Sequence, residues 1–164
     1  MIHTLHPDLS RIGFTDFAPQ RHNKGTYILI IELTKAQEIR PGKLPGTEFK
    51  KGIYLYIGRA KRALQARLKH HLSSQKKAHW HIDFLLNRAH IKEIWIKENF
   101  FDECRTARRI RELFPSVQLA QNGFGSSDCR CPGHLLYSLN GLEELKSIRK
   151  RILFKKVKSY GNCF

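Results

Sequence analysis

The chain of 164 residues carries 30 Lys and Arg against 14 Asp and Glu, which gives a formal net charge of +16. An apolar content of 41%, with ten Phe, five Tyr and two Trp, excludes global disorder and is sufficient for one folded domain with a buried core. Apolar runs such as 27–31 and 53–57 are too short for a bilayer span or an export signal, so we expect a cytoplasmic protein without membrane contact.

Residues 1–24 show no sustained hydrophobic period and predict an irregular lead-in. Segments 26–33 and 52–57 are rich in Ile, Leu and Tyr, which predicts two paired central strands. The long connection 34–51 contains Pro and Gly and is expected to be an inserted loop.

A helix is predicted over 61–72, because Leu64, Leu68 and Leu72 recur at every fourth position. A short apolar stretch at 82–86 is expected to be helical and to precede a third strand over 91–96. Residues 102–114 predict a further helix that ends at Pro115.

The late part of the chain begins with a Gly- and Ser-rich loop over 122–132 and a predicted edge strand over 135–139. Segment 141–156 predicts a basic amphipathic helix. We therefore expect an irregular segment 1–24, an α/β domain over 25–139 in which helices flank a small sheet, and a basic helix and tail over 140–164.

The excess positive charge attracts a polyanion, and nucleic acid is the polyanion that we favour over an anionic membrane surface. The basic segment 146–158 would act as a clamp that reads no base sequence. Gly123 and Gly125 lack the following Gly-Lys-Ser/Thr of a phosphate-cradling loop, so a bound nucleotide cofactor is not expected.

Several polar residues are candidates for chemistry. Tyr27 and Tyr56 lie on the paired central strands, where a simple strand-forming role is the alternative to a catalytic one. Gly58 follows at a strand end and, lacking a Cβ atom, would allow a backbone or a phosphate to come close. Arg67 and His71 lie one helical turn apart and are expected to face one concave surface.

Glu103 extends the apolar stripe of the 102–114 helix and is therefore expected to point toward the sheet. An inward carboxylate either complements the helix dipole or binds a divalent cation such as Mg²⁺. The sequence leaves both roles open for this residue.

The order of these features resembles the GIY-YIG nuclease superfamily, and more narrowly its Uri branch. The resemblance is carried by Gly25-Thr26-Tyr27, Tyr56-Ile57-Gly58, the Arg67 and His71 pair, Glu103 and Asn122, and it covers about residues 25–135. It implies an α+β fold with a small three-stranded antiparallel sheet flanked by helices. It also implies hydrolysis of a phosphodiester bond with Mg²⁺ or Mn²⁺.

On this resemblance, Glu103 would hold the cation, Arg67 would bind the scissile phosphate, and Tyr27 or Tyr56 would orient or deprotonate the attacking water. His71 would assist proton transfer. The expected nucleic-acid contacts are Gly58, Arg59, Lys61, Asn122, Lys150 and Arg151.

Two further clusters contain possible metal ligands. His79, His81 and Asp83 are expected to form hydrogen bonds around a packed Trp80 rather than a metal site. The late cluster Cys129, Cys131 and His134, with Cys104 as a fourth soft ligand, would form a structural Zn²⁺ site, whereas reduced thiols without a metal are the simpler alternative.

The first function hypothesis is a cytoplasmic metal-dependent endonuclease that acts on nucleic acid, with DNA preferred. The second is a non-catalytic nucleic-acid-binding module on the same scaffold, which would explain the charge equally well. A third makes the Cys cluster a redox-dependent or zinc-dependent interaction device. The sequence does not predict an oligomeric state.

Overall fold

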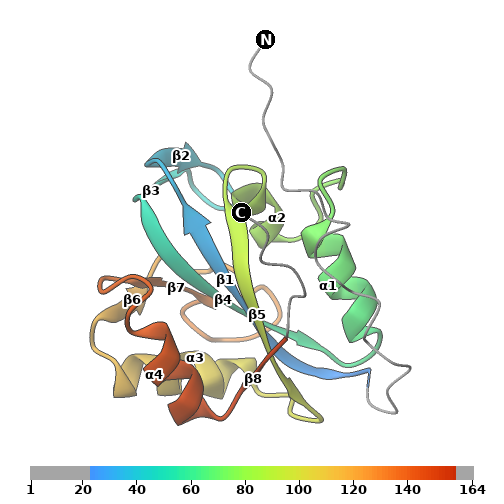
Figure 1. The fold of residues 1–164 in the computed structure, drawn as a ribbon. Helices are drawn as coiled ribbons and strands as arrows, with labels where there is room; N and C mark the ends of the chain where they lie inside the picture. The colour runs from blue at the N-terminus through green and yellow to red at the C-terminus, as the bar shows by residue number, and fades with distance from the viewer. Residues whose placement is uncertain (1–22, 158–164) are drawn as a thin grey trace, which may run out of the picture.

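The computed structural model describes residues 23–157, which form a twisted sheet between two pairs of helices (Figure 1). The main sheet has six antiparallel strands in the order β6-β7-β4-β1-β5-β8. Its strands are β1 (Gly25–Leu33), β4 (Gly52–Ala60), β5 (His90–Glu98), β6 (Val117–Leu119), β7 (Leu135–Ser138) and β8 (Lys155–Lys156). The predicted lead-in and the end of the basic tail lie outside the described residues.

The predicted pairing of the two central strands is confirmed. β1 lies between β4 and β5, and Tyr27 lies opposite Gly58 while Leu29 lies opposite Tyr56. The strands β1 and β4 are buried on both faces of the sheet, which explains their nearly continuous apolar sequence. This register brings the two tyrosine-containing segments together at one end of the sheet.

Two helices cover each face of the sheet. The helices α1 (Leu64–Leu72) and α2 (His81–Leu86) pack on the face that includes Tyr27 and Tyr56. The helices α3 (Glu103–Leu113) and α4 (Leu145–Ile152) pack on the opposite face. The predicted apolar stripe of α1 is confirmed by Leu64 and Leu68, which are fully or almost fully buried.

The start of α1 depends on a residue from the preceding segment. Asn23 accepts hydrogen bonds from Leu64 N through its backbone carbonyl and from Gln65 N, at 2.8 Å, through its side chain. Ala63 has a left-handed backbone (φ 51°), so the helix begins three residues later than predicted.

The inserted segment 34–51 is not a simple loop. It forms the hairpin β2 (Gln37–Ile39) and β3 (Thr47–Phe49), whose Phe49 is buried in the core. Gln121 Nε2 donates to Pro45 O and to Thr47 Oγ1, both at 2.9 Å, and thereby joins this hairpin to the late loop.

Three other predictions about the sheet and the C-terminal helix differ from the structure. The sheet has six strands rather than three, and β7 is an interior strand because β6 pairs with its outer edge. The basic helix ends at Ile152 rather than at 156, because Leu153 takes a left-handed conformation (φ 59°) and the chain then pairs with β5 as β8. Within the described residues, every helix is too short or too polar to cross a membrane.

Candidate active site

A cavity of about 300 Å³ opens at the end of β4. Its walls come from β4, α1, α2 and the segment before it, the start of α3 and the loop 120–134, and include Tyr56, Gly58, Arg59, Arg67, Trp80, His81, Glu103, Asp128 and His134. The structure therefore brings together Tyr56, Arg67 and Glu103, which lie far apart in the sequence.

Glu103 is the first residue of α3 and points toward the sheet as expected. Asp102 caps this helix by accepting a hydrogen bond from Arg105 N at 2.8 Å. Only 4% of Glu103 is exposed, and its Oε1 atom lies 3.2 Å from Arg59 Nε. Its Oε2 atom is buried without a hydrogen-bond partner among residues 23–157.

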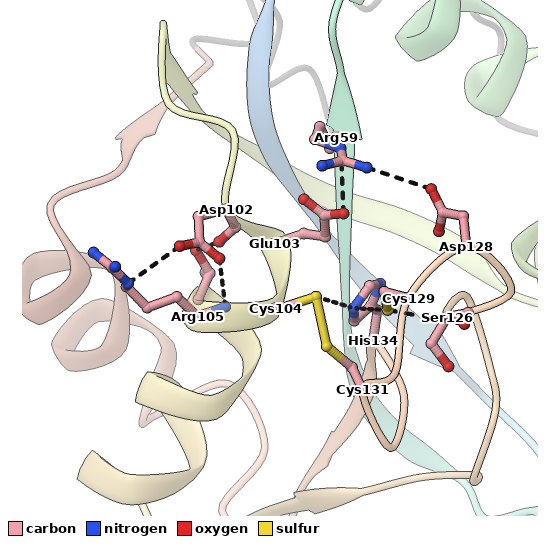
Figure 2. The surroundings of a disulfide bond; sticks show 11 residues. Arg59, Asp102, Glu103, Cys104, Arg105, Ser126, Asp128, Cys129, Cys131 and His134 are labelled. Atoms are coloured by element: carbon pink, nitrogen blue, oxygen red, sulfur yellow. Dashed lines mark hydrogen bonds and ion pairs between the residues drawn. A yellow bond between two sulfur atoms is a disulfide. The ribbon is translucent and has the colours of Figure 1, made fainter.

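Arg59 bridges two carboxylates at the cavity wall (Figure 2). Its Nε atom faces Glu103, and its Nη2 atom donates to Asp128 Oδ2 at 3.3 Å. Asp128 is exposed, whereas Glu103 is buried, so the two ion pairs have different surroundings. Arg59 thus joins β4 to the start of α3 and to the late loop.

Arg67 on α1 is held in one orientation. Its Nη1 atom donates to Arg59 O at 2.6 Å, and its guanidinium lies 4.8 Å from the centre of the Trp80 ring. A guanidinium has five N–H donors. The fixed side chain therefore retains donors for an anion in the cavity.

A chain of three buried polar side chains lies behind the cavity. Tyr27 Oη and His71 Nε2 are 2.8 Å apart, and His71 Nδ1 faces Asp83 Oδ1 across 3.6 Å. Asp83 Oδ2 also accepts hydrogen bonds from the backbone N–H groups of His79 and Trp80. This order of groups is suited to moving a proton from the phenol to the imidazole.

The environment keeps His71 neutral and Asp83 ionised. Burial lowers the pKa of His71 below its ordinary value, although the nearby Asp83 carboxylate opposes the shift. Burial alone would raise the pKa of Asp83, but the contacts from His71, Trp80 and His79 outweigh burial and lower it well below its usual range. A neutral His71 can accept a hydrogen bond from Tyr27 at Nε2, while its Nδ1 faces Asp83 Oδ1 at a distance too long for a hydrogen bond.

Both tyrosines remain protonated near neutral pH. Burial and the neighbouring Tyr56 raise the pKa of Tyr27, while Arg67 lowers it in part. Burial likewise raises the pKa of Tyr56, again against the effect of Arg67. In the absence of a bound cation, His71 is therefore a better proton acceptor than either phenol.

Gly58 separates Tyr27 from the cavity. A Cβ atom at this position would collide with the hydroxyl and the ring of Tyr27. The group that comes close to Gly58 is thus the Tyr27 ring, whereas the sequence suggested a backbone segment or a phosphate. The expectation that Arg67 and His71 face one concave surface is only half correct, because Arg67 lines the cavity and His71 is buried behind it.

The four predicted zinc ligands come together beside this cavity. One ligand atom from each of Cys104, Cys129, Cys131 and His134 lies within 4.8 Å of the others, so the group could hold a metal ion. The structure joins Cys104 and Cys131 by a disulfide bond, which differs from the alternative of reduced thiols without a metal (Figure 2). Cys129 is free.

The remaining predicted nucleic-acid contacts lie outside the cavity. Lys61 is exposed just after β4, and Asn122 is exposed in the late loop. Lys150 and Arg151 are exposed on α4, on the opposite side of the sheet from α1. The structure therefore does not group these four residues with Arg67 and Glu103.

Sequence reasoning did not identify Asp83, Asp128 or Trp80 as parts of the site. The expectation that the histidines near Trp80 form hydrogen bonds is confirmed by His81 Nδ1, which accepts from Gly125 N at 3.1 Å. Asp83 falls on the apolar face of α2 beside Ile82 and Leu86, and this position was the available signal that it is buried.

Comparison with known proteins gives one family. The family described as "Domain of unknown function DUF123" matches residues 26–156, which include the entire cavity wall. Neither the curated proteins nor the solved structures include a match to this chain.

Proposed function

The chain belongs to the DUF123 family, and on the geometry of its cavity we propose that it is a metal-dependent endonuclease that hydrolyses phosphodiester bonds of nucleic acid, with DNA as its main substrate. The observation that supports this function is the convergence of Tyr56, Arg67 and Glu103 on one cavity. The net charge of +16 favours a polyanionic substrate. The resemblance to the GIY-YIG nucleases, Uri branch, belongs to the same proposal.

Glu103 is the residue that would hold Mg²⁺ or Mn²⁺. Its buried Oε2 atom has no partner among the described residues, and a carboxylate oxygen is a ligand that these hard cations prefer. When bound, the cation supplies charge that polarises the phosphoryl group and stabilises the leaving oxygen.

The protein's own side chains account for the other steps. Arg67 binds the scissile phosphate and stabilises the charge that develops on its oxygens, as expected for a guanidinium fixed in advance by Arg59 O and Trp80. Tyr56 at the cavity wall, or Tyr27 behind Gly58, orients the attacking water. His71 then receives the proton through Tyr27, and Asp83 stabilises the resulting imidazolium.

The ion that we propose for the Cys104, Cys129, Cys131 and His134 cluster is a structural Zn²⁺. Thiolate sulfur and imidazole nitrogen are the usual ligands of Zn²⁺, whereas Mg²⁺ and Mn²⁺ prefer oxygen. The proposed protein thus has two metal sites that differ in ligand chemistry.

The test is cleavage of single-stranded, duplex and branched DNA, and of a matched RNA, with and without Mg²⁺ or Mn²⁺. Glu103→Gln and Arg67→Ala should each lower the rate by about 10²- to 10³-fold, because each removes a group that acts on the transition state. Glu48→Gln and Arg88→Ala, at exposed positions outside the cavity wall, serve as matched controls and should cleave at the wild-type rate.

Two results would contradict this function. Unchanged cutting by both site variants would identify a contaminating nuclease. Tight, salt-dependent binding without any cleavage would instead support the non-catalytic binding module, and Glu103→Gln should then bind as well as or better than the wild type.

A further inference from the structure

The Cys104, Cys129, Cys131 and His134 cluster is adjacent in sequence to both carboxylates that hold Arg59. Glu103 immediately precedes Cys104, and Asp128 immediately precedes Cys129. Arg59 contacts both acids, through Nε and Nη2 respectively. Two short segments, 103–104 and 128–129, are thus held together once by Arg59 and once by the cluster (Figure 2).

Two sulfur-to-nitrogen distances in the cluster match those of a tetrahedral zinc site, while the sulfurs of Cys104 and Cys131 are joined as a disulfide and would have to separate on reduction. His134 Nε2 lies 3.5 Å from Cys104 Sγ and 3.6 Å from Cys129 Sγ. Zn–S bonds of about 2.3 Å and Zn–N bonds of about 2.0–2.1 Å at tetrahedral angles place a sulfur and a nitrogen ligand about 3.6 Å apart. A single nitrogen that faces two sulfurs at this distance is arranged as a metal ligand would be.

The late loop is joined to α3 by this cluster as well as by the ion pairs of Arg59. Residues 120–134 form turns without helix or strand and are closed mainly by bonds within the loop, such as Gly123 N to Pro132 O and His134 N to Phe124 O. Cys129, Cys131 and His134 come from this loop, whereas Cys104 comes from the first turn of α3. An ion bound to all four would fix the loop to the helix.

We propose that the reduced Cys104, Cys129, Cys131 and His134 cluster binds Zn²⁺, and that the bound ion positions Glu103 and Asp128 around Arg59. The zinc site is inferred from the four clustered ligands alone, while its effect on catalysis rests on the proposed nuclease function. Zinc is structural here, because four protein ligands leave no open position.

The disulfide and the zinc site are alternative states of the same sulfurs. Reduction of the Cys104–Cys131 bond by a small-molecule thiol consumes two electrons, yields two protein thiols and oxidises two reductant thiols to a disulfide. Zinc binding then displaces the cysteine thiol protons. Cys104 and Cys131 also line a second cavity, of about 420 Å³, which gives the reductant and the ion a path to the sulfurs.

The first measurement is metal content of the full chain purified with a thiol reductant. We expect about one zinc per chain in the wild type and at least a tenfold loss in Cys129→Ser and Cys131→Ser, since three ligands bind far more weakly than four. Arg130→Ala, at an exposed position between two of the ligands that supplies no ligand itself, is the matched control and should keep its zinc. Cys129→His, which replaces one zinc ligand by another, should also retain the ion and shows that any loss is not general misfolding.

The second measurement compares hydrogen exchange of the wild type with zinc and after chelation under reducing conditions. Zinc should slow exchange at least tenfold in residues 102–106 and 120–134, while β1 and β4 serve as internal references that do not change. A cobalt-loaded sample should show the visible absorption of a tetrahedral thiolate site.

Several outcomes would overturn the inference. These are a reduced wild-type protein without zinc, zinc that survives both serine substitutions, or exchange that is the same with and without the ion. None of them depends on cleavage. A failure of the nuclease assay with zinc present, or of the zinc site with cleavage present, can therefore be assigned to one proposal.

Discussion

Arg59 is less suited to bind a phosphate than the sequence suggests, because it is already paired with two carboxylates. Its guanidinium already faces Glu103 and Asp128, so a phosphate at this position must share or displace a carboxylate. Arg67 donates to a backbone carbonyl and lies over an aromatic ring, and among the described residues it forms no ion pair with a carboxylate that a phosphate would have to displace. Arg67 is therefore the better primary ligand for the scissile phosphate.

Asp83 faces His71 across 3.6 Å and raises its pKa, so its removal should affect the rate. Asp83→Asn should lower the cleavage rate by about 10²-fold, within the range of general acid–base contributions. Because Asp83 raises the pKa of His71, its loss should move the acid limb of the pH–rate profile to lower pH. The profile is measured from pH 5 to 9 with Mg²⁺ present.

His70→Gln is the matched control for this variant. His70 Nε2 contacts the other carboxylate oxygen of Asp83 at 3.1 Å, and no contact joins it to Tyr27. Because the neighbouring His70 lowers the pKa of His71, its loss should move the acid limb only toward higher pH, opposite to the shift expected for Asp83→Asn. An unshifted limb in Asp83→Asn would refute the relay from Tyr27 through His71.

At the scale of secondary-structure elements, α4 has one apolar face that packs on the sheet and one basic face that is exposed. Leu145, Ile148 and Ile152 are buried against the sheet together with Ile110 of α3. Lys150 and Arg151 are exposed on the same helix. Substituting the exposed pair should therefore change nucleic-acid binding with little effect on folding.

The Lys150→Ala/Arg151→Ala variant should bind DNA more weakly than the wild type, and equally so for unrelated sequences. If both side chains contact phosphates, the slope of log K against log salt concentration should become shallower by about 1.8. Fluorescence anisotropy over a salt series measures this slope. Lys35→Ala/Arg40→Ala, at exposed positions flanking β2, is the control pair and should keep the wild-type slope. A wild-type slope in the α4 variant would contradict the clamp hypothesis.

At the scale of the whole molecule, hydrophobic periodicity predicted the central strands, the stripe of α1 and the inward direction of Glu103. It did not predict β6 and β8, because strands of three and two residues are shorter than any recognisable pattern. It also could not pair Arg59 with Asp128 or His71 with Asp83. Those contacts depend on how loops and helices pack, and no local pattern in the sequence records that packing.

The buried histidines should make the stability of the whole protein depend on pH. Burial lowers the folded-state pKa of His71, His81 and His134, so as pH falls below the ordinary value of about 6.5 the unfolded chain binds more protons than the folded one. The free energy of unfolding should therefore be greatest above that pH and decrease from pH 7 to pH 5. Urea unfolding at a series of pH values measures the decrease.

His71→Gln should weaken this pH dependence, because it removes one of the three histidines whose pKa burial lowers. His79→Gln, at an exposed position, should keep the wild-type dependence. Equal dependence in all three proteins would show that His71 does not contribute.

The alternation of side chains along β4 has a consequence for sequence changes in this strand. Tyr56 belongs to the core cluster on the α1 face, while Ile57 belongs to the cluster on the α3 face. Deletion of one residue upstream in β4 would exchange these two sides for every later position. The Tyr56 phenol would then point to the α3 face, and the Arg59 side chain would point to the α1 face. This strand should therefore tolerate substitutions far better than any change in its length.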